Sequence, residues 1–302
     1  MRALVLYNNH SGKNKAAQRL EYICTTLKRK YEIVECFKSV HPKSITECIL
    51  EKGSNFDLIL GVGGDGTVNE LINGIMQLDK KPTLAYIPVG TCNDAARTLG
   101  LTKNLKKTLN NILQGDSRRI DAFKVNDKYF IYGLAAGCFT EISYNASFRV
   151  KRRFGKLAYY FQGLKAYKDT KAINIKLIND KEIIDGDFSL FLALNSRYLA
   201  GFKIHRKNRI FLNDGKLRLT LIKKSNKLMN IIDFGMFLLF GESYKHNMLH
   251  LNSSKFSIES NDFITYNTDG ERFDSPKRID VEVIPKSIEV IISKRVKRRH
   301  FL

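Results

Sequence analysis

The feature that most constrains this chain is an apolar run that passes through glycines into an amphipathic segment, at residues 56–70. Phe56–Leu60 has the composition of a buried strand, four glycines follow within six positions, and Thr67–Met76 has the pattern of a helix. Glycines leave backbone N–H groups uncovered at the helix start, where an anion is stabilised. Asp65 within this turn is unusual for a bare phosphate site but fits a divalent cation that accompanies phosphates. The segment therefore predicts a site for a nucleotide with Mg²⁺.

Strand and helix patterns alternate along the first 122 residues. The predicted strands are Arg2–Tyr7, Tyr31–Phe37, Phe56–Leu60 and Thr83–Ile87, and the predicted helices are Lys13–Lys30, Pro42–Lys52 and Thr67–Met76. Repeated units of this size predict a parallel sheet with helices on both faces, and ligands at the carboxyl ends of the strands. Three loops rich in Gly, Asn, Ser or Thr leave these ends: Asn8–Gly12, Gly61–Thr67 and Pro88–Asp94.

The pattern changes in the second half of the chain. Apolar and polar residues alternate with period two at 173–177, 217–221, 256–259 and 281–283, which predicts antiparallel strands arranged as a β-sandwich. Two helical patterns interrupt them, at 154–167 and 227–240. We therefore expect an α/β domain over residues 1–124 and a β-rich domain over 125–302, with a last strand that can pack back on the first domain.

Composition and charge limit the class of protein. The 302 residues, 43% of them hydrophobic and 27% charged, describe a globular chain long enough for two domains. The net charge of +21 attracts nucleic acid, anionic lipid headgroups or polyanionic substrates, unless it is a solvated basic surface. The basic clusters are Arg149–Arg153, Lys203–Arg209, Lys223–Lys224 and Lys294–Arg299.

Several classes of protein are not expected. No apolar segment is long enough to span a bilayer, and the first residues lack the pattern of a signal peptide. The five cysteines form no C-x-x-C pair, which indicates reduced thiols in a cytosolic protein. Six scattered histidines give no zinc motif.

Four motifs together carry a family resemblance. Gly63-Gly-Asp-Gly-Thr67 lacks the P-loop lysine and the dinucleotide-binding spacing, and it resembles the turn of diacylglycerol, sphingosine, ceramide and NAD kinases. Pro88–Arg97 resembles the Pro-x-Gly-Thr-x-Asn-Asp-x-x-Arg block of the lipid kinases. Asn8–Gly12 resembles their Asn-Pro-x-Ser-Gly, with Asn9 in place of proline, and Asp269-Gly-Glu271 resembles their carboxylate motif. The chain is thus similar to the bacterial diacylglycerol kinase-like family along nearly its whole length.

The resemblance implies an ATP site at the three loops. Its residues are Asn8, Asn9, His10, Ser11, Gly12, Ser39, Gly63, Gly64, Asp65, Gly66, Thr67, Asn69, Glu70, Thr91, Asn93 and Arg97. The residues alone leave simpler alternatives, because Ser11 also suits a helix N-cap and Thr91 with Asn93 a polar turn after Pro88.

Two metal sites follow from the same resemblance. Asp65, Asp94 and Asp121 are expected to organise Mg²⁺, water and the nucleotide. A second, structural Mg²⁺ is expected on Asp214 and the backbone carbonyls of Phe211 and Lys216. A simple turn is the alternative there, because His205–Arg209 places four cationic side chains close by.

The resemblance also predicts the chemistry. Asp269 is the expected base for the lipid hydroxyl that attacks the γ-phosphate, with Glu271 as the alternative or as its orienting neighbour. Without the resemblance, Asp269-Gly270 is more typical of a tight hairpin turn than of a catalytic base.

The expected function is an ATP-dependent lipid kinase, converting diacylglycerol to phosphatidate. We expect it to be cytoplasmic and to associate peripherally with anionic phospholipid headgroups, with a homodimer possible through exposed strand edges and with no nucleic acid partner. The alternatives are a kinase of NAD or a sugar phosphate, and a non-catalytic nucleotide- or nucleic-acid-binding protein.

Overall fold

The computed structural model describes residues 1–8, 15–90, 93–114, 117–137, 172–199, 202–204, 210–275, 277–292 and 301. Its first part is a parallel sheet in the order β4-β3-β1-β2, formed by β1 (Arg2–Tyr7), β2 (Ile33–Lys38), β3 (Leu58–Gly63) and β4 (Thr83–Pro88). The helices between and after these strands are α1 (Lys15–Leu27), α2 (Ser44–Lys52), α3 (Asp65–Ile75), α4 (Asp94–Thr98) and α5 (Leu105–Gln114).

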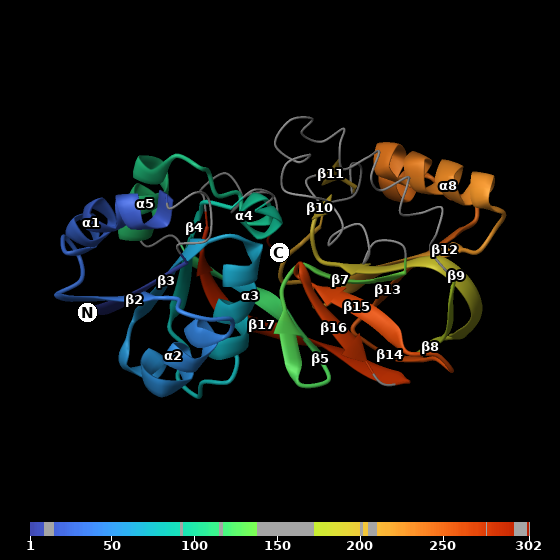
Figure 1. The fold of residues 1–302 in the computed structure, drawn as a ribbon, viewed down its shortest axis with the longest axis horizontal. Helices are drawn as coiled ribbons and strands as arrows, with labels where there is room; N and C mark the ends of the chain where they lie inside the picture. Colours follow the sequence, from blue (N-terminus) through green and yellow to red (C-terminus); the bar gives the residue numbers. More distant parts are fainter. Residues whose placement is uncertain are drawn as a thin grey trace.

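The parallel sheet is covered on both faces because apolar side chains occupy both sides of its strands. Leu4 and Leu6 of β1 pack in one core with α2, α3 and α4, whereas Ala3 and Val5 pack in another with α1 and α5. Figure 1 shows α1 and α5 on one side of the sheet and α2 with α3 on the other.

The second part of the chain is built mainly from antiparallel strands. They are β5 (Ser117–Val125), β6 (Lys128–Phe130), β7 (Gly133–Gly137), β8 (Ile173–Asn179), β9 (Ile183–Leu194), β10 (Tyr198–Leu199), β11 (Phe202–Lys203), β12 (Leu217–Lys223), β13 (Met248–Ser253), β14 (Lys255–Glu259), β15 (Ile264–Thr268), β16 (Glu271–Ser275) and β17 (Arg278–Ile291). The helix α8 (Lys227–Phe240) crosses outside them, and short 3₁₀ turns lie at η1 (Gly53–Asn55) and η2 (Gly241–Ser243). Apolar side chains from β5 to β9, β12, β14, β15 and β17 share one core.

Strand β17 joins the two parts. It pairs with β14 and β5 along most of its length and then, in parallel, with β4 at Val290 and Leu84. The register shifts between Ile284 and Ile288, where Lys286 adopts a positive φ of 50°, and this bulge lets one strand serve both regions. The described strands therefore form one 15-stranded sheet and the small β10-β11 pair.

The predicted fold class is confirmed: parallel strands with helices come first, and an antiparallel, strand-rich part follows. The sheet continues from one part to the other through β17 and β4, and the division at residue 124 stays a prediction. The predicted helix at 227–240 is α8, whereas the one at 154–167 lies outside the described residues. No described helix is long and apolar enough to cross a membrane.

Candidate active site

The Gly-rich turn links the end of β3 to the start of α3. A Cβ on Gly63 would lie 2.0 Å from Oγ1 of Thr67, and a Cβ on Gly61 would lie 2.2 Å from Cδ1 of Leu71. These two glycines are therefore required because α3 packs directly on the strand that precedes it. The other two glycines, Gly64 and Gly66, lie at the start of the helix. Among the described residues, no side chain caps the backbone there.

The loop after β4 packs on this turn through backbone contacts. The carbonyl oxygen of Gly63 accepts hydrogen bonds from the N–H of Val89 (2.9 Å), the N–H of Gly90 (3.2 Å) and the hydroxyl of Tyr86 (2.9 Å). Asn93 adopts a left-handed backbone (φ 53°), and its Nδ2 donates to the carbonyl of Gly90 at 2.6 Å. Two of the predicted loops thus meet at the carboxyl ends of β3 and β4.

Asp65 fastens the two loops together. Its carboxylate accepts hydrogen bonds from the N–H of Asn93 (2.8 Å) and of Ala95 (3.3 Å), at the start of α4. Burial raises the pKa of Asp65, while these N–H groups and the charge of Arg97 act in the opposite direction. Asp65 therefore orders the backbone around the helix start and keeps lone pairs that a cation can use.

Asp269 lies at the tip of the β15–β16 hairpin and is buried. It has φ 50° and the following Gly270 has φ 96°, as a two-residue hairpin turn requires. Its carboxylate accepts three backbone hydrogen bonds, from the N–H of Ile131 (2.8 Å), Tyr132 (3.0 Å) and Gly133 (3.0 Å). Burial outweighs these bonds and, with the charge of Asp65, raises the pKa of Asp269 to about 7.

The hairpin tip lies directly against the Gly-rich turn, although the two motifs are about two hundred residues apart in sequence. A Cβ on Gly66 would lie 2.6 Å from Oε1 of Glu271, and a Cβ on Gly270 would lie 4.0 Å from Cβ of Asp65. Desolvation and the Glu70 carboxylate raise the pKa of Glu271, and Lys128 opposes them. Asp65 from the first part of the chain and the 269–271 carboxylates from the second part therefore share one site.

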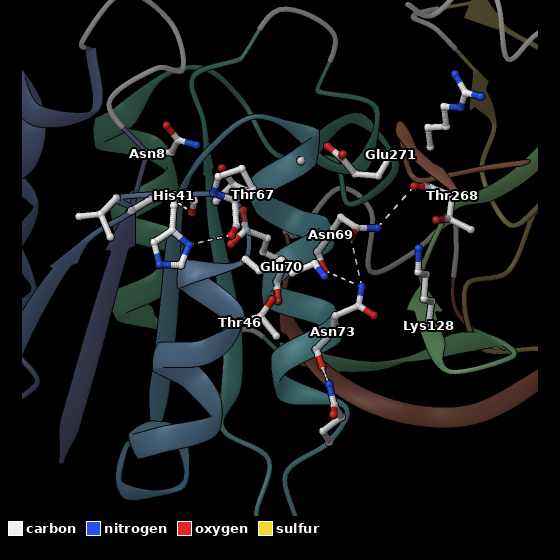
Figure 2. A pocket seen from close by; sticks show the side chains of 17 residues that line it. Asn8, His41, Thr46, Thr67, Asn69, Glu70, Asn73, Lys128, Thr268 and Glu271 are labelled. Atoms are coloured by element: carbon white, nitrogen blue, oxygen red, sulfur yellow. Dashed lines mark hydrogen bonds between the residues drawn. The ribbon is translucent and has the colours of Figure 1, made fainter. Parts of the chain in front are cut away.

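A cavity of about 630 Å³ opens beside this contact. Its lining comes from both parts of the chain: Asn8, Ser39, Val40, His41, Pro42, Lys43, Thr46, Gly66, Thr67, Asn69, Glu70, Asn73, Gln77, Lys128, Thr268, Glu271 and Arg272. Figure 2 shows α3 running through the middle, with Asn8 and His41 on one side and Thr268 and Lys128 on the other.

The polar face of α3 bridges the two parts of the chain. Asn69 donates from Nδ2 to the carbonyl of Thr268 at 3.4 Å. Asn73, one turn further, donates to the carbonyl of Tyr129 and accepts from its N–H, both at 2.9 Å (Figure 2 labels both asparagines). Asn69, predicted to bind ATP, thus also holds the two walls of the cavity together.

The Thr67 hydroxyl is the side-chain group that most favours an anion at the start of α3. Its side chain is buried in the first turn of α3, and Oγ1 has no hydrogen-bond partner in the structure as described. A buried hydroxyl without a partner is costly, and an anion at the helix N-terminus would satisfy it.

Some predicted ATP residues also have structural partners. The Glu70 carboxylate accepts from the N–H of Ile45 at 3.0 Å and so caps α2, and burial raises its pKa. Ser39 is buried and shares a hydrogen bond of 3.2 Å with Ser44. Arg97 lies on α4, where its charge acts on Asp65. Asn9, His10, Ser11, Gly12 and Thr91 lie outside the described residues.

Basic side chains that the sequence analysis did not predict as site residues also line the cavity. Lys128 follows the β5–β6 turn, its Nζ lies 4.8 Å from the ring centroid of Phe273, and burial followed by the charge of Lys43 lowers its pKa. Lys43 and Arg272 line the same space. No local motif marks these residues, because β6 and β16 approach α3 only in the folded chain.

The three aspartates expected to organise Mg²⁺ do not form a cluster. Asp121 is buried on β5, where it accepts from the N–H of Gly215 (2.7 Å) and of Lys286 (2.8 Å). Burial raises the pKa of Asp121, and the charge of Asp214 acts in the same direction. The N–H groups of Lys286 and Gly215 and the charge of Lys286 oppose this rise. Asp94, also buried, begins α4 beside Asp65. Within the described part of the chain, no group of three or more His, Cys, Asp or Glu side chains could hold a metal ion.

The expected structural Mg²⁺ site is occupied by an arginine. The guanidinium of Arg218 forms an ion pair with the Asp214 carboxylate, and its NH1 also donates to the carbonyl of Lys216 at 3.1 Å. These are two of the three expected ligands, and NH1 reaches Asn195 Oδ1 at 3.2 Å as well. A guanidinium there supplies the charge that a cation would bring, so the residues do not fit a metal ion.

Comparisons with known proteins show the family to which the chain belongs. Residues 2–125 match the family model of the diacylglycerol kinase catalytic domain. A diacylglycerol kinase of Staphylococcus saprophyticus is 32% identical over 275 residues, covering 89% of this chain and 88% of its own, and one of Bacillus subtilis is 31% identical over 277 residues, covering 89% of each. A solved structure of a putative diacylglycerol kinase from Bacillus anthracis has a TM-score of 0.83 at 26% identity and covers 98% of this chain and 96% of its own.

A Gly-rich helix start in contact with a carboxylate hairpin beside a cavity, together with these relatives, defines the chain as a kinase, an enzyme of the transferase class. It belongs to the bacterial diacylglycerol kinase family, as its motifs indicated.

The Arg218–Asp214 pair gives a test of the metal assignment. Both side chains are largely buried, at 15% and 12% exposed. Arg218→Ala should lower the free energy of unfolding by about 3 kcal/mol, because it leaves a buried carboxylate unpaired. EDTA should leave the thermal midpoint of the nucleotide-free wild-type protein unchanged, whereas Mg²⁺ should partly restore the variant. Differential scanning calorimetry measures both.

The matched control is Arg278→Ala. Arg278 pairs with Glu259 and Asp280 but is exposed, so its loss should cost less than about 1 kcal/mol. A lowered midpoint of the wild-type protein in EDTA, together with one bound Mg²⁺ per chain by elemental analysis, would contradict this account.

Proposed function

We propose that this kinase transfers the γ-phosphate of ATP to the hydroxyl of diacylglycerol, giving phosphatidate and ADP. The observation that carries the proposal is the contact between the 269–271 hairpin and the start of α3, because it sets carboxylates opposite an uncapped helix N-terminus. The relatives named as diacylglycerol kinases support the choice of acceptor.

The phosphate groups of ATP would bind at the start of α3. Its first N–H groups and the unpartnered Thr67 hydroxyl are the donors for them. Lys128 and Lys43 would add positive charge from the cavity wall. Because the Glu271 carboxylate lies against Gly66, arriving phosphates would displace it toward the acceptor.

Magnesium would accompany the nucleotide. Mg²⁺ is usually held by one or two carboxylates together with substrate phosphates, so the absence of a cluster of three ligands among the described residues does not argue against it. Asp65, with Asp94 beside it, would hold the ion and so neutralise charge on the transferring group.

Asp269 would accept the proton from the attacking hydroxyl. The new bond joins the hydroxyl oxygen to the γ-phosphorus, the bond from that phosphorus to the bridging oxygen breaks, and ADP leaves. A base with a pKa of about 7 is well matched to neutral pH, and three N–H bonds hold its orientation. Glu271, which lines the cavity, would orient the acceptor.

The direct test is phosphate transfer from γ-labelled ATP to a total lipid extract. We expect one labelled product that co-migrates with phosphatidate and requires Mg²⁺. Label transfer to NAD⁺ or a sugar phosphate instead, or to no acceptor at all, would overturn the proposal.

The dependence of kcat/KM on pH distinguishes the proposed roles of Asp269 and Glu271. Since Asp269 must be deprotonated, kcat/KM should rise tenfold per pH unit below about 7 and level off above it. Asp269→Asn should lose roughly 10²- to 10⁴-fold in kcat, and Glu271→Gln should lose less and keep the profile.

Circular dichroism and thermal melting would show whether Asp269→Asn is folded, because an amide replaces an acceptor of three N–H groups. If Glu271→Gln abolishes the pH dependence while folded Asp269→Asn retains it, Glu271 is the base and the assignment is reversed.

A further inference from the structure

Helix α8 has an inverted polarity. Asp233 is the one charged residue between Leu228 and Phe240, and it is fully buried. Large apolar side chains point outward instead: Leu228 is 70% exposed, Leu239 is 52% exposed and Ile232 is 44% exposed. A helix on the surface of a globular protein normally directs its charged residues to solvent.

The exposed residues form one stripe. At 100° per residue, positions 228, 232 and 239 fall within an arc of about 40°. Met229 and Met236 are partly exposed next to it, and Phe240 is 51% exposed at the end of the helix. Contiguous apolar surface of this kind indicates a contact face rather than scattered exposure.

The helix is fixed in this orientation from below. Phe234 and Phe237 pack in a core with residues of β9, β12 and β13, which Figure 1 shows beneath α8. The Asp233 carboxylate accepts from the hydroxyl of Tyr244 (2.7 Å) and from Nδ2 of Asn247 (3.1 Å), and it lies 3.0 Å from Nδ1 of His246. Turning the stripe inward would expose this core and separate the Asp233 carboxylate from its three partners, so the stripe stays outside.

Exposed lysines lie on the two segments that flank α8 in the chain. Lys223 is the last residue of β12, four positions before α8 begins, and Lys245 lies after the helix, next to Tyr244, which contacts Asp233; both lysines are exposed. An apolar helix face flanked by lysines is the arrangement of helices that lie in the headgroup region of an anionic bilayer. At 14 residues α8 is too short to span a bilayer, which leaves the interfacial position.

We propose that the stripe Leu228, Met229, Ile232, Met236, Leu239 and Phe240 is the surface by which this chain docks on anionic phospholipid bilayers. The inference rests on the proposed function, because an enzyme whose acceptor is a membrane lipid must reach the bilayer. It adds the element that makes the contact: apolar side chains enter the headgroup region while Lys223 and Lys245 contact lipid phosphates.

The test is co-sedimentation of the full chain with phosphatidylcholine vesicles, with and without phosphatidylglycerol. Wild-type protein should bind vesicles that contain phosphatidylglycerol, and this binding should weaken as the salt concentration rises. Leu228→Ser/Leu239→Ser should weaken binding tenfold or more. Lys223→Gln/Lys245→Gln should weaken it about thirty-fold at low salt and much less at high salt.

The matched control replaces two exposed apolar residues outside α8. Ile183 is 62% exposed and Phe263 is 81% exposed, and Ile183→Ser/Phe263→Ser should bind vesicles as the wild-type protein does. With a short-chain, water-soluble diacylglycerol the α8 variant should keep wild-type kcat/KM, while its activity on vesicle-embedded substrate falls with its binding.

The Asp269→Asn variant separates docking from catalysis: it should bind vesicles as the wild-type protein does, while its kcat falls roughly 10²- to 10⁴-fold. Vesicle binding by a wild-type protein that phosphorylates no lipid would sustain the docking surface and remove the kinase proposal. Equal vesicle binding by the wild-type and α8 variant proteins would overturn the docking surface. So would a wild-type dimer that the α8 substitutions convert to monomer, because the stripe would then join two copies of this chain.

Discussion

The carboxylate of Asp269, held by three backbone N–H groups, is the interaction on which the rest of the site depends. It fixes the tip of the β15–β16 hairpin to the segment between β6 and β7, and that tip is what reaches the Gly-rich turn. Together with the hydrogen bond from Asn69 to the carbonyl of Thr268, it sets the place of Glu271 relative to α3. The pKa of about 7 follows from the same burial, so one contact supplies both the architecture of the site and a base suited to neutral pH.

The continuous sheet explains how two differently built halves can share one site. Strand β17 belongs to the antiparallel part for most of its length and ends beside β4 of the parallel part. Asn69 and Asn73 of α3 reinforce the junction with hydrogen bonds to β15 and β6. The cavity is therefore bounded by elements that are hydrogen-bonded to each other, which favours a preformed donor site over one assembled on binding.

The sequence predicted those parts of the fold and site that depend on local patterns. Short apolar runs gave β1, β3 and β4, and the glycines with Asp65 marked the helix start correctly to within two residues. Contacts between residues far apart in the chain could not be predicted from the sequence. The cap that Glu70 forms on α2, the position of Lys128 and the pairing of Arg218 with Asp214 all join segments whose proximity arises only on folding. Asp233 interrupts the apolar sequence of α8, and only the structure reveals that it points inward to three partners.

The central claim is that nucleotide phosphates bind between the start of α3 and the 269–271 hairpin. A crystal structure of the protein with a non-hydrolysable ATP analogue and Mg²⁺ tests it most directly. The account predicts a terminal phosphate at the N–H groups of residues 65–67, within hydrogen-bond reach of Thr67 Oγ1, with Glu271 moved off Gly66. An analogue bound elsewhere, with the Thr67 hydroxyl still without a partner, would contradict it.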